Sequence, residues 1–148
     1  LNRRELYAMI TSDYKYRCTA IETAKRKTEQ KGAPVYLYEF RWRTPVLGGI
    51  LMSPHTMCIP FSFGNVAAAR NFIGTGKEQE KLKKEVMGAW IAFAQTGNPN
   101  HQDLISWPQY ELTKKPTMIF DTVSRVENNP KPEELEVINS CAPFVADA

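Results

Sequence analysis

The chain has 148 residues, of which 43% are hydrophobic and 24% charged, with a formal net charge of +3. This length allows one compact domain with a real core, and the composition is ordinary for a globular protein. So mild a charge indicates no particular class of partner and gives no support for nucleic-acid binding.

Targeting and cysteine signals are sparse. From the sequence alone, no signal peptide and no membrane-spanning segment are expected within these residues. Its three cysteines, Cys18, Cys58 and Cys141, are widely spaced, odd in number and free of any Cys-x-x-Cys pair. Such usage argues against a disulfide framework and predicts a reducing, cytoplasmic location.

The first third of the chain predicts two helices and a strand. Residues 1–10 form a short apolar stripe, and Ser12 or Asp13 offers an N-cap for a second helix that closes at Gly32. Basic residues in the last turns of this second helix suit the negative end of its dipole, which explains them better than a nucleic-acid patch. Residues 33–43 predict a strand that is buried at first and then alternates, with Phe40 and Trp42 on one face.

A long, uncharged connection follows that strand. Residues 44–69 contain no Lys, Arg, Asp or Glu, and His55 and Cys58 are their titratable groups of note. Prolines and glycines through the stretch exclude a membrane helix. The apolar, proline-braced setting predicts an imidazole held at a fixed angle away from water, as a general base requires. The alternative is a hydrogen-bonded core histidine with no catalytic role.

A short helix over residues 65–72 and a break at residues 73–76 lead into the strongest helical pattern, residues 77–96, with Gly97 as the C-cap. Its apolar stripe predicts a buried face that includes Trp90 and Phe93. The charged positions, among them Glu85, predict a solvated face.

His101 lies in a polar, turn-rich loop and is expected to be exposed, with nothing beside it to orient the ring. A metal site at His55 and Cys58 is not expected, because zinc needs three or four ligands and no other Cys or His is near in sequence. No cofactor is indicated.

The last third predicts mostly short elements. Residues 107–110 (Trp-Pro-Gln-Tyr) form an aromatic plug in irregular chain, and residues 117–120 and 124–127 form an antiparallel hairpin. Residues 130–139 form a closing helix, with acidic residues in its first turn. The tail, residues 141–148, is expected to be loosely held.

Four motifs in register resemble one known family. Ser53-Pro54-His55-Thr56-Met57-Cys58-Ile59-Pro60-Phe61-x-Phe63-Gly64-Asn65 is similar to the histidine loop of type-B carboxylesterases, the cholinesterase-like branch of the α/β-hydrolases. The preceding Pro34-Val35-Tyr36-Leu37-Tyr38-Glu39-Phe40 looks like the strand that leads into that loop. Trp90-x-x-Phe93-Ala94-x-Thr96-Gly97-Asn98-Pro99-Asn100 and Trp107-Pro108-x-Tyr110 resemble two later motifs of the family, in the same order.

The resemblance implies an α/β fold and makes His55 the histidine of a Ser-Glu/Asp-His triad. One departure is Cys58, because the family usually carries Glu or Asp three residues after the histidine; that carboxylate is not the triad acid. No serine of the chain stands in a Gly-x-Ser-x-Gly elbow. Since the triad order in this fold is serine, acid, histidine, residues 1–148 are expected to be the C-terminal segment of a catalytic domain, inactive without the nucleophile.

The expected function is therefore part of a carboxylic ester hydrolase. Its expected partners are a small-molecule ester and the missing N-terminal part of the same enzyme, with no nucleic acid and no membrane. Ile59, Phe61 and Phe63 could wall the acyl pocket or simply pack the loop. Apolar surface left exposed on the segment would favour homo-oligomers. The alternative from another class is a non-catalytic, cholinesterase-like binding or adhesion module.

Overall fold

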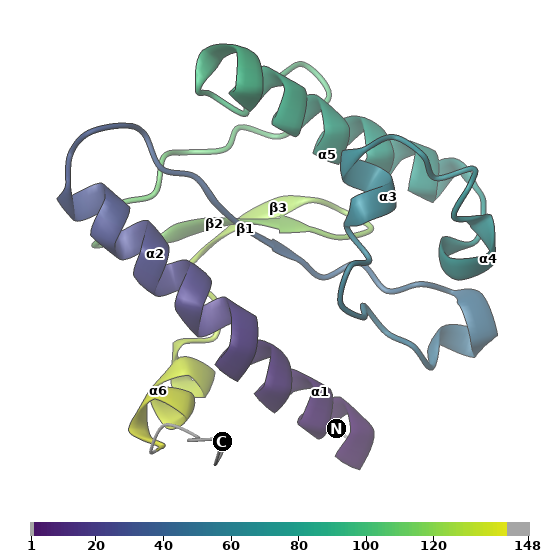
Figure 1. Cartoon of the computed structure of the whole chain (residues 1–148), viewed down its shortest axis with the longest axis horizontal. Coiled ribbons are helices and arrows are strands. Elements are labelled where there is room, and N and C mark those ends of the chain that lie inside the picture. The colour runs from purple at the N-terminus through teal and green to yellow at the C-terminus, as the bar shows by residue number, and fades with distance from the viewer. Residues whose placement is uncertain (1, 142–148) are drawn as a thin grey trace, which may run out of the picture.

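The structure is a computed structural model that describes residues 2–141. A small sheet lies between helix α5 on one side and the long N-terminal helical segment on the other (Figure 1). The strands are β1 (Leu37–Phe40), β2 (Pro116–Phe120) and β3 (Arg125–Asn128). The helices are α1 (Arg3–Ser12), α2 (Cys18–Glu29), α3 (Ile59–Ser62), α4 (Arg70–Ile73), α5 (Lys77–Thr96) and α6 (Pro132–Ser140), with a π-helical turn η1 (Asp13–Arg17) and a 3₁₀ turn η2 (Val46–Gly49).

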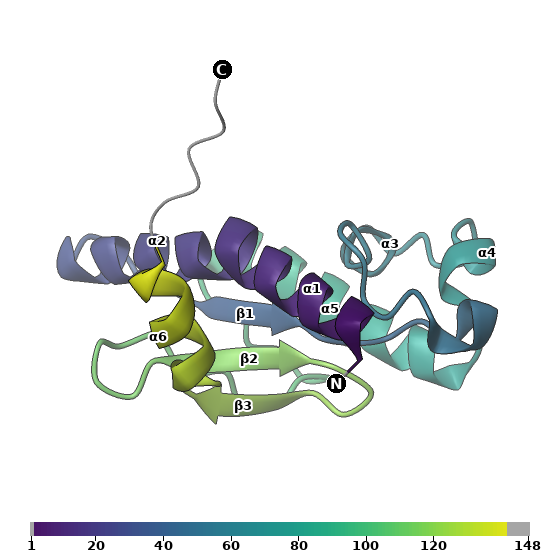
Figure 2. The same cartoon turned by 90° about the horizontal axis from the view of Figure 1, so that it is seen from below.

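The sheet has the order β1-β2-β3 (Figure 2). β1 and β2 run parallel, with Leu37 opposite Thr117 and Phe40 opposite Phe120, whereas β2 and β3 are antiparallel. The predicted hairpin is thus confirmed, and so is the α/β class. β1 is an edge strand of this sheet, because its second side has no strand partner within residues 2–141.

The helical segment before the sheet corrects a prediction. Ser12 and Asp13 do not cap a second helix, because α1, η1 and α2 follow one another without a break from residue 3 to residue 29. Asp13 is buried and its carboxylate pairs with Arg17, so it is not available to cap backbone amides. The N-cap is Asn2, whose side chain accepts from the Glu5 amide in a capping box.

β1 is also shorter than the predicted strand over residues 33–43. β2 offers partners for only four of its positions, and the Arg41 and Trp42 amides both donate to the Phe120 carbonyl, at 2.8 and 3.2 Å. The two faces of the strand alternate as predicted at its end. Trp42 is fully buried, while Glu39 and Arg41 form an ion pair at 2.7 Å.

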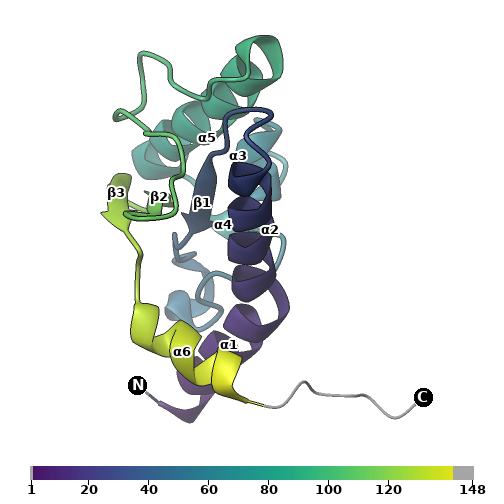
Figure 3. The same ribbon diagram turned by 90° about the vertical axis from the view of Figure 1, so that its left-hand side faces the viewer.

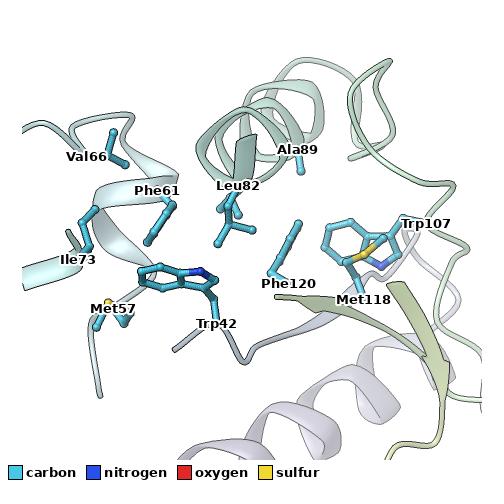
Figure 4. Close-up of a cluster of buried hydrophobic side chains, with 11 residues drawn as sticks. Trp42, Met57, Phe61, Val66, Ile73, Leu82, Ala89, Trp107, Met118 and Phe120 are labelled. Atoms are coloured by element: carbon cyan, nitrogen blue, oxygen red, sulfur yellow. The ribbon is translucent and has the colours of Figure 1, made fainter. Parts of the chain in front are cut away.

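The main core lies between the sheet and α5 (Figure 4). The Trp42 and Phe61 rings meet edge to face with centroids 5.2 Å apart, and Trp107 meets Phe120 in the same way at 5.7 Å. Leu82 projects from α5 toward these rings. Burying several aromatic side chains is the largest apolar contribution that a chain of this size can make, so this cluster holds α3 and α5 to the sheet.

α5 confirms its predicted bounds, and Gly97 ends it in the left-handed conformation at φ 74°. Two predicted core residues are exceptions. Trp90 is 50% exposed and Phe93 43% exposed, and each touches a tyrosine of the β1 segment by its edge. Because β1 is the edge strand of the described sheet, these tyrosines cover only part of each ring, which the helical period alone could not show.

Glu85 also departs from prediction, because it is only 5% exposed. Its Oε2 accepts a hydrogen bond from the Ser124 hydroxyl at 2.6 Å, and its Oε1 pairs with Lys81 at 2.9 Å. A buried carboxylate is tolerated when such partners replace water. Glu85 therefore ties α5 to the loop before β3.

His101 is partly buried and well oriented, contrary to prediction. Its Nδ1 accepts from the Asp103 amide at 3.3 Å, so its Nε2 carries the proton and donates to the Glu85 carbonyl at 3.0 Å. The ring covers Gly88, where an added Cβ would lie 2.5 Å from the imidazole Cε1. The absence of a side chain at Gly88 is what allows His101 to pack there.

We therefore expect Gly88→Ala to lower the free energy of unfolding by about 1–3 kcal/mol, as overpacking does. The change should be destabilising although alanine is a better helix former than glycine by about 1 kcal/mol. Urea denaturation measures it. In a His101→Ala background the same Gly88→Ala change should cost little, because the ring that the new Cβ would meet is gone. A Gly88→Ala variant as stable as the parent would contradict the packing described.

Among residues 2–141, no helix combines the length and apolar character needed to cross a bilayer. The predicted loose tail falls, from residue 142 onward, outside the described residues.

Candidate functional site

The connection that carries His55 is tied to the end of β1. The Ser53 hydroxyl donates to the Phe40 carbonyl at 3.5 Å, and the Thr44 amide donates to the Met52 carbonyl at 3.0 Å. The Thr44 hydroxyl in turn donates to the Phe72 carbonyl in α4. The loop therefore starts at the carboxyl end of a parallel strand, where sites form in open α/β sheets.

His55 stands at the second position of a tight turn. The Met57 amide donates to the Pro54 carbonyl at 3.0 Å, and Thr56 has φ 74°. This φ is that of the third residue of a type II turn, a position that normally takes glycine or asparagine. A β-branched residue there is an outlier that the surrounding structure must enforce.

Buried residues that follow His55 hold this turn in place. Met57 is 1% exposed and Phe61 is fully buried, so the chain after His55 is anchored in the core. The predicted dry setting of His55 is wrong for the described chain, because the imidazole is exposed although Met57 and Phe61 close to it are buried. The predicted fixed angle is nonetheless supported by a ring contact.

That contact is with Tyr16 of η1. The His55 and Tyr16 rings stack with centroids 4.8 Å apart and planes 12° apart. Within residues 2–141 the imidazole makes no hydrogen bond and no ion pair, so neither ring nitrogen is committed to a partner. The turn and the stack leave the imidazole oriented yet open to a reactant.

Cys58 stands where the resemblance expects an acidic residue. It is half-buried at the start of α3, and its carbonyl accepts from the Phe61 and Ser62 amides. Burial raises the pKa of the Cys58 thiol and likewise the pKa of Tyr38 nearby. A neutral thiol cannot supply the charge of a carboxylate, so this position gives His55 no electrostatic support.

The three residues proposed to wall the acyl pocket differ in exposure. Phe61 belongs to the core and is not available to a substrate. Ile59, the first residue of α3, is 45% exposed, and Phe63, just after α3, is 76% exposed. These two remain candidates for contact with an apolar group near His55.

An ion cluster around Arg17 was not foreseen. Its guanidinium, 10% exposed, faces the carboxylates of Asp13 at 3.3 Å, Glu134 at 3.4 Å and Glu39 at 3.6 Å. Arg17 also donates to the Pro130 carbonyl. Burial, opposed by the Arg17 charge, raises the pKa of Asp13. The cluster joins η1 to β1 and to α6. Figure 3 shows α6 beside α1, at the lower end of that view.

The sequence alone could have indicated only one of the ion pairs of Arg17, the one with Asp13. Asp13 and Arg17 are spaced i,i+4 on a helix, which any exposed pair also shows. The other two carboxylates lie 22 and 117 residues from Arg17 in the chain and meet it only through the fold.

Within residues 2–141, no serine hydroxyl or cysteine thiol donates a hydrogen bond to His55. The Ser53, Ser62 and Ser124 hydroxyls donate to other acceptors, namely the carbonyls of Phe40 and Cys58 and the Glu85 carboxylate. Within residues 2–141, no group of three or more Cys, His, Asp and Glu side chains could hold a metal ion.

A groove of about 730 Å³ opens beside the amino end of β1. Its walls come from α2, from the segment leading into β1 and from Phe93 of α5. Ala20, Ala24, Val35 and Leu37 make much of the lining apolar. Within residues 2–141, the sheet is therefore open at its β1 edge, where the groove lies.

Comparison with known proteins places this geometry in context. The family profile described as "Carboxylesterase family" matches residues 2–138. The chain is 36% identical over 101 residues to the medium-chain fatty acyl-CoA hydrolase precursor of Anas platyrhynchos, covering 66% of this chain and 17% of that protein. It is 33% identical over 104 residues to the para-nitrobenzyl esterase of Bacillus subtilis (strain 168), covering 69% of this chain and 21% of that protein.

A solved structure agrees. An esterase from anaerobic Clostridium hathewayi, described as able to hydrolyse aliphatic aromatic polyesters, superposes with a TM-score of 0.65 at 32% identity. The match covers 74% of this chain and 22% of that one. The chain therefore spans about a fifth of the length of these relatives.

Proposed function

The chain belongs to the carboxylesterase family, and on that premise we propose that it supplies the general-base histidine, His55, of a carboxylic ester hydrolase. The α/β class and the likeness to solved esterases make it part of an α/β-hydrolase fold. The nucleophile and the acid of the triad would come from residues that precede this segment in the complete enzyme.

One observation carries the proposal. The only exposed imidazole of the described residues lies on a strained turn just past the carboxyl end of β1, with no hydrogen bond to either nitrogen. A structural histidine has its nitrogens bonded, as His101 does. Leaving an oriented imidazole unbonded is useful where a reactant completes the bonding.

The reaction would proceed by acyl transfer. The His55 imidazole would take the proton of the serine hydroxyl as the oxygen attacks the ester carbonyl, and would then give it to the leaving alcohol. In the second half it would take a proton from water, whose oxygen attacks the acyl-enzyme and releases the acid. The triad acid would bind the second nitrogen and so fix the tautomer.

The open β1 edge of the sheet supports the proposal that a preceding part of the enzyme packs against this segment. A parallel strand is normally flanked by strands and covered on both faces, and β1 has a partner on one side only within residues 2–141. The free edge of β1 and the apolar groove beside it would take up the preceding part of the enzyme. Without that part, the same surface would favour association between copies of the chain.

A non-catalytic binding module is the second candidate. Cys58 favours it, because the residue that replaces the family's carboxylate is a neutral, half-buried thiol. The presence of His55 on its enforced turn favours the enzyme.

The test is turnover of short p-nitrophenyl esters by the complete protein, together with labelling by a fluorophosphonate, which reacts with activated serines. Turnover and labelling that are both abolished by His55→Gln support the proposal. A complete protein that folds but neither turns over these esters nor takes the label would overturn it in favour of the binding module.

A further inference from the structure

The Tyr16–His55 stack has geometry that can hold an imidazole. Aromatic rings attract one another at centroid separations of about 4.5–7 Å, and near-parallel planes give the largest contact area. At 4.8 Å and 12°, one face of the His55 ring is covered by the Tyr16 ring. Rotation of the imidazole out of that plane would lose the contact, so the stack selects one ring orientation.

The backbone around Tyr16 is fixed by the ion pairs of its neighbour Arg17. Tyr16 lies within the π-helical turn η1, and the next residue, Arg17, is bound to carboxylates of η1, β1 and α6. Single π-helical turns are uncommon and often occur at functional sites. Because Arg17 fixes η1 against the strand that leads to the His55 loop, Tyr16 and His55 sit on parts of the chain that cannot drift apart freely.

Tyr16 does not serve the core. Its side chain is 52% exposed, and within residues 2–141 the contact with His55 is the ring contact it makes. An exposed aromatic ring that stacks on an exposed, unbonded imidazole is poorly explained by stability alone.

We propose that Tyr16 is a positioning residue for His55: its ring holds the plane of the imidazole and faces the positive charge that forms when His55 takes a proton. The inference rests on the proposed function. The π face of an aromatic ring attracts a cation at such a distance. The neutral thiol of Cys58 cannot stabilise a positive charge on His55 as a carboxylate at that position would. The contact with the Tyr16 ring is therefore the more important for stabilising the imidazolium.

The kinetic experiment compares Tyr16→Leu with Tyr16→Phe in the complete enzyme. Tyr16→Leu removes the ring and is expected to lower kcat about 3- to 10-fold, the equivalent of one aromatic contact, with KM nearly unchanged. Tyr16→Phe keeps the ring face and should retain kcat. Equal kcat values for the leucine variant and the parent would overturn the inference.

A spectroscopic readout separates this inference from the proposed function. The His55 ring protons, assigned by their loss in His55→Gln, should be shifted upfield by the tyrosine ring and show contacts to its protons. They should move downfield in Tyr16→Leu and stay in Tyr16→Phe, while His101 resonances remain unchanged. If the parent protein shows no such contacts, the inference fails even where His55→Gln abolishes turnover; if the contacts are present but His55→Gln stays active, it is the proposed function that fails.

Discussion

Replacing His55 by alanine in the complete enzyme is expected to lower kcat for ester hydrolysis by about three to six orders of magnitude, the loss seen when a triad histidine is removed. The imidazole is the group proposed to move the proton in both halves of the reaction. The fold should be unaffected, because His55 is exposed and binds no backbone group within residues 2–141. Stopped-flow or steady-state assays with p-nitrophenyl esters measure the change.

The second histidine provides a matched control. His101→Ala removes one hydrogen bond that holds the loop against α5 and one within the loop, so it should lower stability and leave kcat within a few-fold of the parent. The reverse pattern, with His55→Ala retaining most activity, would contradict the role proposed for His55.

Replacing Arg17 by methionine is expected to lower the free energy of unfolding by about 3 kcal/mol or more, since removing one partner of a buried ion cluster leaves uncompensated charge. The buried Asp13 carboxylate would lose its cation, whereas Glu39 and Glu134 would keep Arg41 and Lys131 as partners. Methionine keeps much of the volume, so the loss reports charge and hydrogen bonding more than packing. Urea denaturation gives the value.

Arg26 serves as the control on the same helical segment. It pairs with Glu22 at i,i+4, as Arg17 does with Asp13, but its side chain is 72% exposed. Arg26→Met should therefore leave stability essentially unchanged, because exposed pairs are screened by water. Equal effects of the two substitutions would show that the Arg17 cluster contributes no more than a surface pair.

Patterns with a strong local cause are the ones that sequence predicts well. α5 has a sustained helical period and a glycine stop, and β2 and β3 are two short runs of strand-forming residues on either side of a turn, so neighbouring residues alone are enough to recognise them. The loop after β1 stands out because it lacks charge. The motif resemblance points to the same family as the comparison with known proteins.

The sequence predictions that were wrong concern residues whose surroundings come from distant parts of the chain. Glu85 looks like a surface residue of α5 until Ser124 comes to lie against it, and His101 looks free until Gly88 leaves room for its ring. Trp90 fits the apolar stripe of α5, yet it is half exposed because the described sheet has no strand beyond β1 to cover it. The exposure of His55 arises in the same way, because Met57 and Phe61, which follow it, enter the core while the imidazole does not.

The most direct test of the central claim is to read the coding sequence immediately upstream of Leu1. If His55 is a triad histidine, that region encodes a Gly-x-Ser-x-Gly elbow followed, before this segment, by an acidic residue able to orient the imidazole. An upstream region without the elbow serine would leave His55 no nucleophile to serve, and would contradict the assignment of this chain to an ester hydrolase.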